Sequence, residues 1–295
     1  MPTSFFRRLL EPLRRAYRWL QSTPGVVTYL GGHRALVRTG YGRHLFVDTR
    51  DLSVAPQLLL HGNWEPGVTR TVRKLLRPSM TVIEVGANVG YYSMLAAWLV
   101  ERTGRVYSFE ANPHLARLLR QGAEINGFSD RLTVIEKAAW SSTGTVDFHL
   151  LEEHMGSSSA STAIDRTAQS FHDRTEKITV DAVALDGAFP AGTRVDLLKI
   201  DAEGAEGHVL RGGHRLLQEN PEVRVVMEFY PSNFPDPGEA GEVLDQLTSL
   251  GFQWGKIEVD HPRGRMKAVS RGELMATTHA ELLLWRGGGG PWPRS

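Results

Sequence analysis

The sequence predicts an α/β protein whose mostly parallel β-sheet is covered by helices on both faces. Three observations carry this prediction. From residue 81 onward, short apolar segments alternate with helical ones, as in a parallel sheet with crossover helices. Residues 81–93 have the pattern of a buried strand, a glycine turn and a helix. About 20 residues after that turn a second strand ends in Glu110, and the two features together indicate a Rossmann-like nucleoside site.

The composition is that of an ordinary globular protein. Of the 295 residues, 41% are hydrophobic and 23% are charged, and the formal net charge is +1. So small a charge offers no electrostatic footprint for a polyanion, and no nucleic-acid partner is expected. The absence of cysteine excludes disulfides and thiolate metal sites and agrees with a cytoplasmic protein. No apolar run is long enough to cross a bilayer, so no transmembrane segment is expected.

Residues 1–78 are predicted to form an N-terminal extension. Apolar residues at helical spacing between Phe5 and Leu20, with arginines around them, indicate an amphipathic helix. We interpret it as packed on its own domain or on a partner in a homodimer, and contact with an anionic membrane surface is the alternative. Glycine-separated segments in residues 25–51 indicate a small β-meander. A turn cluster then leads into a helix that ends at Leu76.

The main domain is predicted over residues 79–287, followed by a frayed tail over 288–295. Its sheet has seven expected strands, at residues 81–85, 105–110, 132–137, 195–201, 222–229, 252–259 and 281–285. The expected helices lie at residues 91–101, 113–126, 205–218 and 238–250. Two further strands, at 144–150 and 178–185, flank the polar, serine-rich stretch 152–176. That stretch is interpreted as either a disordered linker or a lid over the site.

The glycine turn indicates which nucleoside cofactor binds. The dinucleotide fingerprint has a glycine where this chain has Asn88, between Gly86 and Gly90. Glu84, on the strand before the turn, would repel a pyrophosphate but suits a cationic ligand without phosphate. S-adenosylmethionine, with its sulfonium and ammonium groups, meets that demand. The alternative is that Glu84 and Asn88 only cap and tie the turn.

Acidic residues recur where the predicted strands end. In an open α/β sheet, ligands bind outside the carboxyl ends of the strands. The acids at these ends are Glu84, Glu110, Asp201 with Glu203, and Glu228. We expect Asp201 to be functional. For Glu203 and Glu206, capping of the following helix is a reasonable alternative, because acids are favoured at helix N-termini.

Three motifs in this order resemble the FkbM-type family of S-adenosylmethionine-dependent methyltransferases. They are Glu84-Val-Gly-Ala-Asn-Val-Gly-Tyr-Tyr-Ser93, Phe109-Glu-Ala-Asn-Pro113 and Asp196-Leu-Leu-Lys-Ile-Asp-Ala-Glu-Gly-Ala-Glu206, and the third is the most specific. The resemblance spans residues 63–229. It implies a class I methyltransferase sheet of seven strands with the last one antiparallel, and an activity that is usually O-methylation of a hydroxyl.

The resemblance also implies roles for individual residues. Glu84, Gly86, Asn88 and Gly90 would surround the methionine part of the cofactor, Glu110 would hold the ribose, Ala111 would lie beside the adenine, and Asp201 near the methyl group. The predicted cofactor site further includes Ala87, Ala139 and, from the turn cluster, Glu65. One departure is that Ala138-Ala139-Trp140 stands where many class I enzymes place an acid or amide for the adenine amino group. Backbone groups and Trp140 packing are the expected substitute.

Deprotonation of an alcohol acceptor requires a base or a metal. Asp201, Glu203 and Glu228 are the candidates, either as a direct base or as oxygen ligands of a divalent cation such as Mg²⁺. His154, His172 and His208 are rival bases. The predicted function is therefore O-methylation of a hydroxyl on a small molecule, natural product or glycan. The alternatives are N- or carboxyl-methylation of a peptide and a non-catalytic S-adenosylmethionine-binding module.

Overall fold

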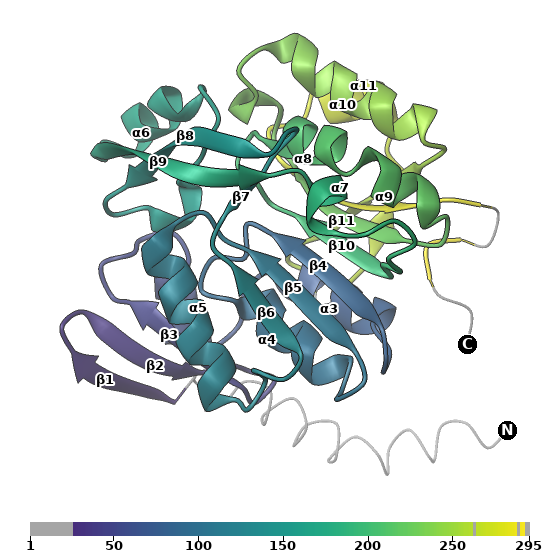
Figure 1. Ribbon diagram of the computed structural model, residues 1–295. Coiled ribbons are helices and arrows are strands. Elements are labelled where there is room, and N and C mark those ends of the chain that lie inside the picture. Colours follow the sequence, from purple (N-terminus) through teal and green to yellow (C-terminus); the bar gives the residue numbers. More distant parts are fainter. Residues whose placement is uncertain (1–25, 262–263, 288–289, 293–295) are drawn as a thin grey trace, which may run out of the picture.

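The computed structural model describes residues 26–261, 264–287 and 290–292, and its centre is an eight-stranded sheet (Figure 1). The helix predicted within residues 5–20 lies outside the described residues, as does most of the predicted tail. Strand β4 (Thr81–Val85) is the third strand from one edge of the sheet, between β5 (Arg105–Phe109) and β10 (Leu197–Ile200). Next to these lie β6 (Leu132–Ile135) and β11 (Arg224–Phe229), and all five strands are parallel.

The antiparallel strand that was predicted lies inside the sheet, beyond the five parallel strands. Strand β14 (Ala280–Trp285) runs antiparallel to both β11 and β12 (Gln253–Ile257). The seven predicted strands are thus confirmed. The short β13 (Met266–Lys267), which pairs with β12, adds an eighth that the sequence did not predict.

Helices cover both faces of the sheet, as expected. Helices α3 (Pro66–Leu75), α4 (Tyr91–Leu99) and α5 (Pro113–Ile125) pack on the face to which Val82, Val106 and Leu197 point. The opposite face, with Ile83 and Leu198, is covered by α7 (Leu185–Ala188), α8 (Glu206–Gly212), α9 (His214–Glu219), α10 (Pro237–Ser249) and α11 (Arg271–Met275). The single helix predicted over residues 205–218 is two helices that meet at Gly213, because adjacent glycines weaken a helix.

The predicted β-meander is present as β1 (Val27–Gly31), β2 (Arg34–Arg38) and β3 (His44–Asp48). Helix α2 (Ala55–His61) follows it and was not predicted. Leu45 and Val47 of β3 belong to the same hydrophobic cluster as Leu118 of α5 and Leu95 of α4. The hydrophobic core therefore continues across the boundary predicted at residue 78.

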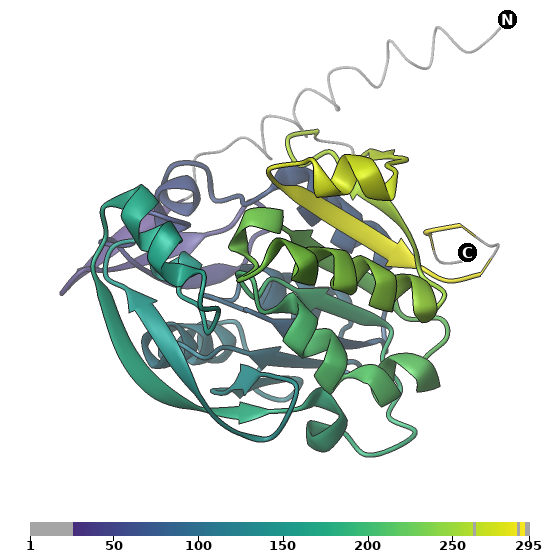
Figure 2. The ribbon, with the colours of Figure 1, turned by 90° about the horizontal axis from the view of Figure 1, so that it is seen from above.

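A third, small sheet is separate from both the main sheet and the β-meander. It contains β7 (Ala138–Ala139), β9 (Thr175–Val183) and β8 (Gly144–Leu151). The serine-rich stretch between β8 and β9 forms the 3₁₀ turn η1 (Met155–Ser157) and α6 (Ile164–Phe171), which lies over the end of the β8–β9 ribbon (Figure 2). The interpretation of this stretch as a disordered linker is therefore wrong.

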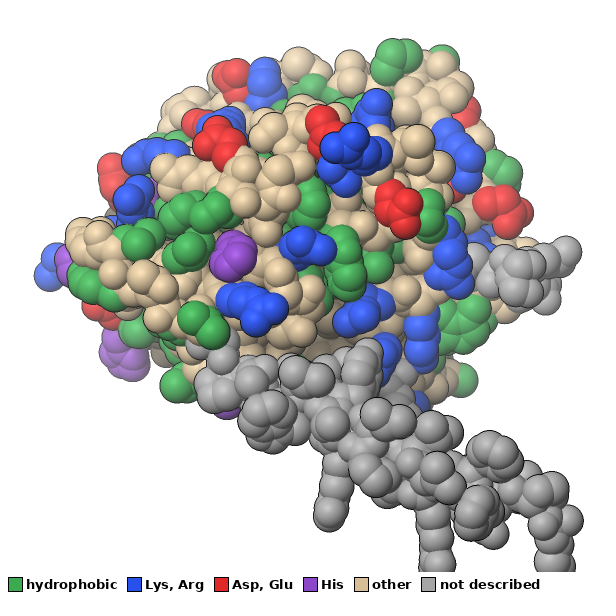
Figure 3. Space-filling view, turned by 90° about the horizontal axis from the view of Figure 1, so that it is seen from below, with side chains coloured by type: hydrophobic (Ala, Val, Ile, Leu, Met, Phe, Trp, Pro, Cys, Tyr) green, Lys and Arg blue, Asp and Glu red, His purple; other side chains and the backbone are tan. Residues whose placement is uncertain are grey.

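None of the described helices combines the length and the hydrophobicity that crossing a membrane requires. On the visible part of the face in Figure 3, Lys and Arg side chains are interspersed with polar, acidic and hydrophobic ones.

Candidate functional site

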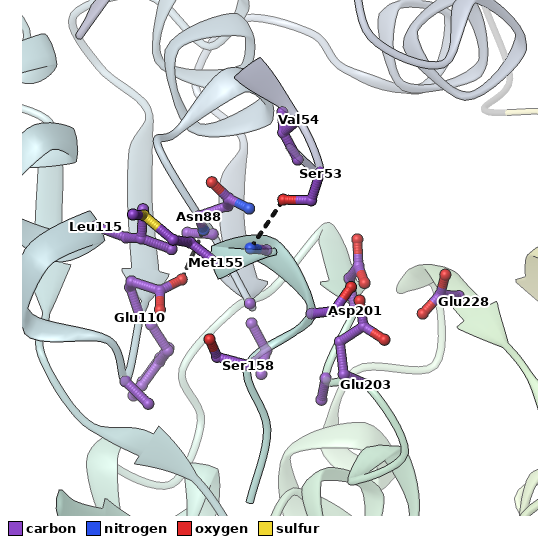
Figure 4. Close-up of a pocket in the computed structure, with 18 of the residues that line it drawn as sticks. Ser53, Val54, Asn88, Glu110, Leu115, Met155, Ser158, Asp201, Glu203 and Glu228 are labelled. Atoms are coloured by element: carbon purple, nitrogen blue, oxygen red, sulfur yellow. Dashed lines mark hydrogen bonds between the residues drawn. The ribbon is translucent and has the colours of Figure 1, made fainter. Parts of the chain in front are cut away.

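A cavity of about 440 Å³ opens at the carboxyl ends of β4, β5, β10 and β11. Its walls come from these strand ends and the turns that follow them, from residues 52–54 and 64–65 of the extension, and from the segment around η1. Figure 4 shows Glu110 and Leu115 on one side of it and Asp201, Glu203 and Glu228 on the other, with η1 crossing between them. Its position is the one that the parallel sheet predicts.

The glycine turn after β4 forms the floor of the cavity. Gly86 has φ +75°, and a Cβ atom there would overlap the backbone carbonyl of Asp201. Asn88 also has a left-handed backbone, with φ +52°, which asparagine tolerates better than most residues. Gly86, Ala87 and Asn88 line the cavity, but Gly90 does not. Gly90 instead has φ +87°, and a Cβ atom there would meet the Leu119 side chain, so its predicted place around the methionine part of the cofactor stays a prediction.

Glu110 is buried at the end of β5 and is tied to the glycine turn. Its Oε2 accepts a hydrogen bond from the backbone N–H of Asn88 at 2.6 Å, and its Oε1 accepts one from the backbone N–H of Asn112 at 2.8 Å. Burial raises the pKa of Glu110 to about 7. A carboxylate has roughly four lone-pair positions, so capacity remains for the two hydroxyls of a ribose.

A row of polar residues crosses the sheet beneath the cavity. Glu84 of β4 lies opposite Lys199 of β10, and its Oε2 accepts a hydrogen bond from the Ser93 hydroxyl. The Lys199 ammonium is 2.9 Å from Asp201 Oδ2 and lies over the ring of Tyr92. Burial by itself would lower the pKa of Lys199. The charges of Asp201, Glu281, Glu65 and Glu84 outweigh burial and hold that pKa above its ordinary value.

Three of the predicted strand-end acids come together. One carboxylate oxygen from each of Asp201, Glu203 and Glu228 lies within 4.8 Å of the other two. Glu203 has a left-handed backbone with φ +50°, a strained conformation for a glutamate, and its Oε2 accepts a hydrogen bond from Nδ2 of the Asn233 side chain at 3.1 Å. Burial raises the pKa of Glu203 well above its ordinary value and that of Glu228 to about 7, and neighbouring carboxylates add to both shifts.

Glu65 belongs to this acidic end of the cavity. It precedes α3 with φ +39°, and its Oε2 accepts a hydrogen bond from the Tyr92 hydroxyl at 2.8 Å. Burial raises the pKa of Glu65 to about 7, and Lys199 and Asp201 are the charges that influence it most. The structure therefore places Glu65 beside the acids at the strand ends.

The lining of the cavity near Glu110 includes small and aromatic side chains. Ala111, Ala139 and Trp140, the residues predicted to lie near the adenine, are among them. Trp140 stacks on His208, with ring centroids 3.7 Å apart. Burial and the nearby Arg211 lower the pKa of His208 to about 4.

Of the three rival bases, only His154 lines the cavity. Its Nδ1 is 3.0 Å from a carboxylate oxygen of Asp173, and its ring stacks on Phe171. His172 and His208 are outside the lining.

The segment around η1 closes part of the cavity. The Met155 amide donates to Asp51 Oδ1 at 3.1 Å, and the Gly156 amide donates to Ser53 Oγ at 2.9 Å. Sequence reasoning missed Ser53, because nothing in its neighbourhood resembles a motif. Lys199 could have been found, because a single lysine in the apolar strand Leu-Leu-Lys-Ile indicates a buried ion pair.

Comparison with known proteins relates the chain to methyltransferases. The model of the methyltransferase FkbM domain matches residues 84–254. A protein-L-isoaspartate O-methyltransferase from Aeropyrum pernix is 35% identical over 136 residues, which are 43% of this chain and 48% of that protein. The chain therefore spans about half of the length of this curated relative.

Solved structures with a similar course of the chain have low sequence identity. A SAM-dependent methyltransferase from Aquifex aeolicus is 16% identical, with a TM-score of 0.42 over 78% of this chain and 93% of that chain. A SAM-dependent O-methyltransferase from Thermotoga maritima is 12% identical, with a TM-score of 0.40 over 91% of this chain and 88% of that chain. Neither likeness bears on what this chain acts on.

Proposed function

Because this chain belongs to the FkbM-domain methyltransferase family, we propose that it transfers a methyl group from S-adenosylmethionine to a hydroxyl oxygen of its acceptor. The observation that carries the proposal is one cavity with two unlike ends. A buried carboxylate, Glu110, is fixed by the glycine turn at one end, and the carboxylates of Asp201, Glu203 and Glu228 gather at the other.

The cofactor would lie across the floor of this cavity. Glu110 would accept hydrogen bonds from the ribose hydroxyls, and Ala111, Ala139 and Trp140 would flank the adenine. Glu84, Asn88 and the open backbone at Gly86 and Ala87 would receive the methionine part. The sulfonium would then point toward Asp201, where negative charge favours it.

The acids at the other end would activate the acceptor. Methyl transfer is an in-line displacement, so alignment of the nucleophile, the methyl group and the sulfur supplies much of the rate. Asp201, Glu203 or Glu228 would take the hydroxyl proton as that bond forms, and a carboxyl whose pKa is near 7 suits this task. The same three oxygens could instead hold Mg²⁺, which prefers oxygen ligands.

Carboxyl methylation of a peptide is the second candidate, because the curated relative is named for isoaspartate. The acidic end of the cavity disfavours it, because an ionised carboxylate acceptor would be repelled by Asp201, Glu203 and Glu228. A neutral hydroxyl on a small molecule, glycan or peptide meets no such repulsion.

Calorimetric titration with S-adenosylmethionine and with S-adenosylhomocysteine tests the cofactor site. We expect the wild-type protein to bind both, and Glu110→Gln to bind at least about tenfold more weakly, because a hydrogen bond to a charged group contributes about 1.5–3 kcal/mol. The control is Glu124→Gln, which alters an exposed glutamate on α5. Equal affinity of Glu110→Gln and wild type would contradict the ribose assignment.

Release of S-adenosylhomocysteine, measured across a panel of hydroxyl, amine and carboxyl acceptors, tests the reaction. Binding without release from any acceptor would favour a non-catalytic module. Turnover that survives both chelation and Asp201→Asn would remove the acid and metal roles while leaving the cofactor site intact.

A further inference from the structure

Strands β11 and β14 place two glutamates face to face. Glu228 and Glu281 are direct partners in this antiparallel pair, and their strand neighbours Val226 and Leu283 belong to the core cluster on one face of the sheet. Both glutamates therefore point to the same face, beneath α3 and α4. Like charges directly opposite on neighbouring strands destabilise a sheet, so this pairing favours a positive charge between the two, which a protonated histidine or a bound ion would supply.

His279, two residues before Glu281, completes a cluster of three. Its Nε2 is 3.1 Å from Glu228 Oε1 and 3.6 Å from Glu281 Oε1. One side-chain atom from each of the three residues lies within 4.8 Å of the others, which is close enough for all three to contact a single ion.

Hydrogen bonds within the described part of the chain leave this cluster incomplete. Oε2 of Glu228 and Oε2 of Glu281 are both buried and have no hydrogen-bond partner there. Glu281 is only 1% exposed, so bulk water does not reach it freely. The nearby Lys199 ammonium contacts Asp201. A buried carboxylate oxygen without a partner is costly, and a bound ion is one way to satisfy it.

We propose that Glu228, His279 and Glu281 bind one divalent transition-metal ion. The donor set carries the choice of metal, because an imidazole nitrogen with carboxylate oxygens suits Mn²⁺, Fe²⁺ or Zn²⁺, whereas Mg²⁺ and Ca²⁺ prefer oxygen alone. The His279 side chain is 37% exposed, which gives an ion a route from solvent.

This site is distinct from the all-oxygen group of Asp201, Glu203 and Glu228, with which it shares only Glu228. Three protein ligands leave coordination positions that water or an acceptor oxygen would fill. Because Glu228 also lines the cavity, an ion bound here would lie at the wall of the proposed acceptor site. The inference goes beyond the proposed methyl transfer and does not depend on it.

Titration of the full-length, metal-stripped protein with Mn²⁺ alone, followed by electron paramagnetic resonance, tests the site without cofactor or acceptor. We expect one bound Mn²⁺ per chain, with a ¹⁴N coupling from the His279 ring in the electron spin-echo modulation. Glu281→Gln is expected to weaken binding at least about tenfold, because even the loss of a supporting partner of a metal ligand typically costs 10–100-fold. His279→Gln is expected to abolish the nitrogen coupling.

Glu203→Gln is the matched control, because it removes a ligand of the all-oxygen group and leaves all three proposed ligands in place. Circular dichroism of each variant establishes that it is folded. The proposal is overturned if wild type binds no Mn²⁺, if the nitrogen coupling survives in His279→Gln, or if Glu203→Gln loses binding while Glu281→Gln keeps it. Cofactor titrations on the same preparations report separately on the proposed function.

Discussion

Gly86 shows at the scale of one residue why the sequence needs glycine in this turn. Its φ of +75° disfavours any residue with a Cβ, and that Cβ would also overlap the Asp201 carbonyl. We expect Gly86→Ala to lower the free energy of unfolding by more than the roughly 1–2 kcal/mol that a left-handed backbone alone costs. Urea titration measures this loss.

Gly127→Ala is the matched control for that prediction. Gly127 has a similar φ of +67°, but no atom lies within 4 Å of a Cβ placed there. The loss of stability in Gly127→Ala therefore measures the cost of the left-handed backbone alone. If the free energy of unfolding fell equally in both variants, the overlap with the Asp201 carbonyl would not contribute to the loss.

Single residues were predicted best where they belong to one continuous motif. Glu84, Gly86, Asn88 and Glu110 come from a strand, a turn and the next strand, and all four line the cavity. Gly90 belongs to the same motif but lies outside the lining, and the sequence alone does not distinguish a glycine required by packing from one required by a ligand. What distinguishes them is Leu119, which comes from another helix.

At the scale of elements, the segment between β8 and β9 is held on the main sheet by hydroxyl groups. Ser159 Oγ donates to the Glu203 carbonyl at 2.8 Å and accepts from the Ser161 amide at 2.9 Å. We expect Ser159→Ala to cost about 1–3 kcal/mol, because it leaves buried backbone groups without partners. Limited proteolysis within residues 152–174 should then become faster, and bound cofactor should slow it.

Ser170→Ala provides the comparison within the same segment. Ser170 lies on α6, and its hydroxyl donates to the nearby Thr167 carbonyl at an exposed position. We expect no change in cleavage for this variant. Equal acceleration in both variants would mean that Ser159 does not fasten the segment.

Three of the elements that were missed, α6, η1 and β13, depend on partners that are distant in the sequence. Helix α6 and the turn η1 are made from a polar, serine-rich stretch, and their order comes from contacts with residues 51–53, 203 and 233. The intrinsic helix propensity of these residues does not include contacts with residues distant in the sequence. Strand β13 is only two residues long and depends on pairing with β12.

At the scale of the whole molecule, the site concentrates buried carboxyl groups. Burial raises the pKa of Glu65, Glu84, Glu110, Glu228 and Glu281 to about 7, and that of Glu206 to about 8. In each case the folded state binds the proton more tightly than the unfolded state, whose carboxyls titrate near 4.5. The stability they confer is therefore full below pH about 4.5 and is lost as pH rises through the folded values.

Glu206→Gln isolates one of these groups. Its Oε1 accepts hydrogen bonds from the Ala202 and Gly204 amides, and a glutamine oxygen can accept the same bonds. The wild-type free energy of unfolding should fall between pH 5 and pH 8, by about 1.4 kcal/mol for each unit of pKa difference traversed. In Glu206→Gln that fall should be smaller.

Urea titrations at the two pH values measure the difference, with Glu242→Gln on the exposed side of α10 as control. An unchanged pH dependence in Glu206→Gln would show that this carboxyl does not keep its proton in the folded protein.

The sequence by itself determined the succession of the main strands and helices along the chain, the glycine turn and Glu110, because each follows from residues that are neighbours along the chain. The tertiary structure alone decided that Glu65 and Lys199 line the acidic end of the cavity and that His279 and Glu281 lie against Glu228 at its wall. Their meeting depends on the pairing of β11 with β14 and of β4 with β10. Strand order and register come from long-range packing, and because side chains alternate between faces, a shift of one residue would have sent these charges to the other side of the sheet.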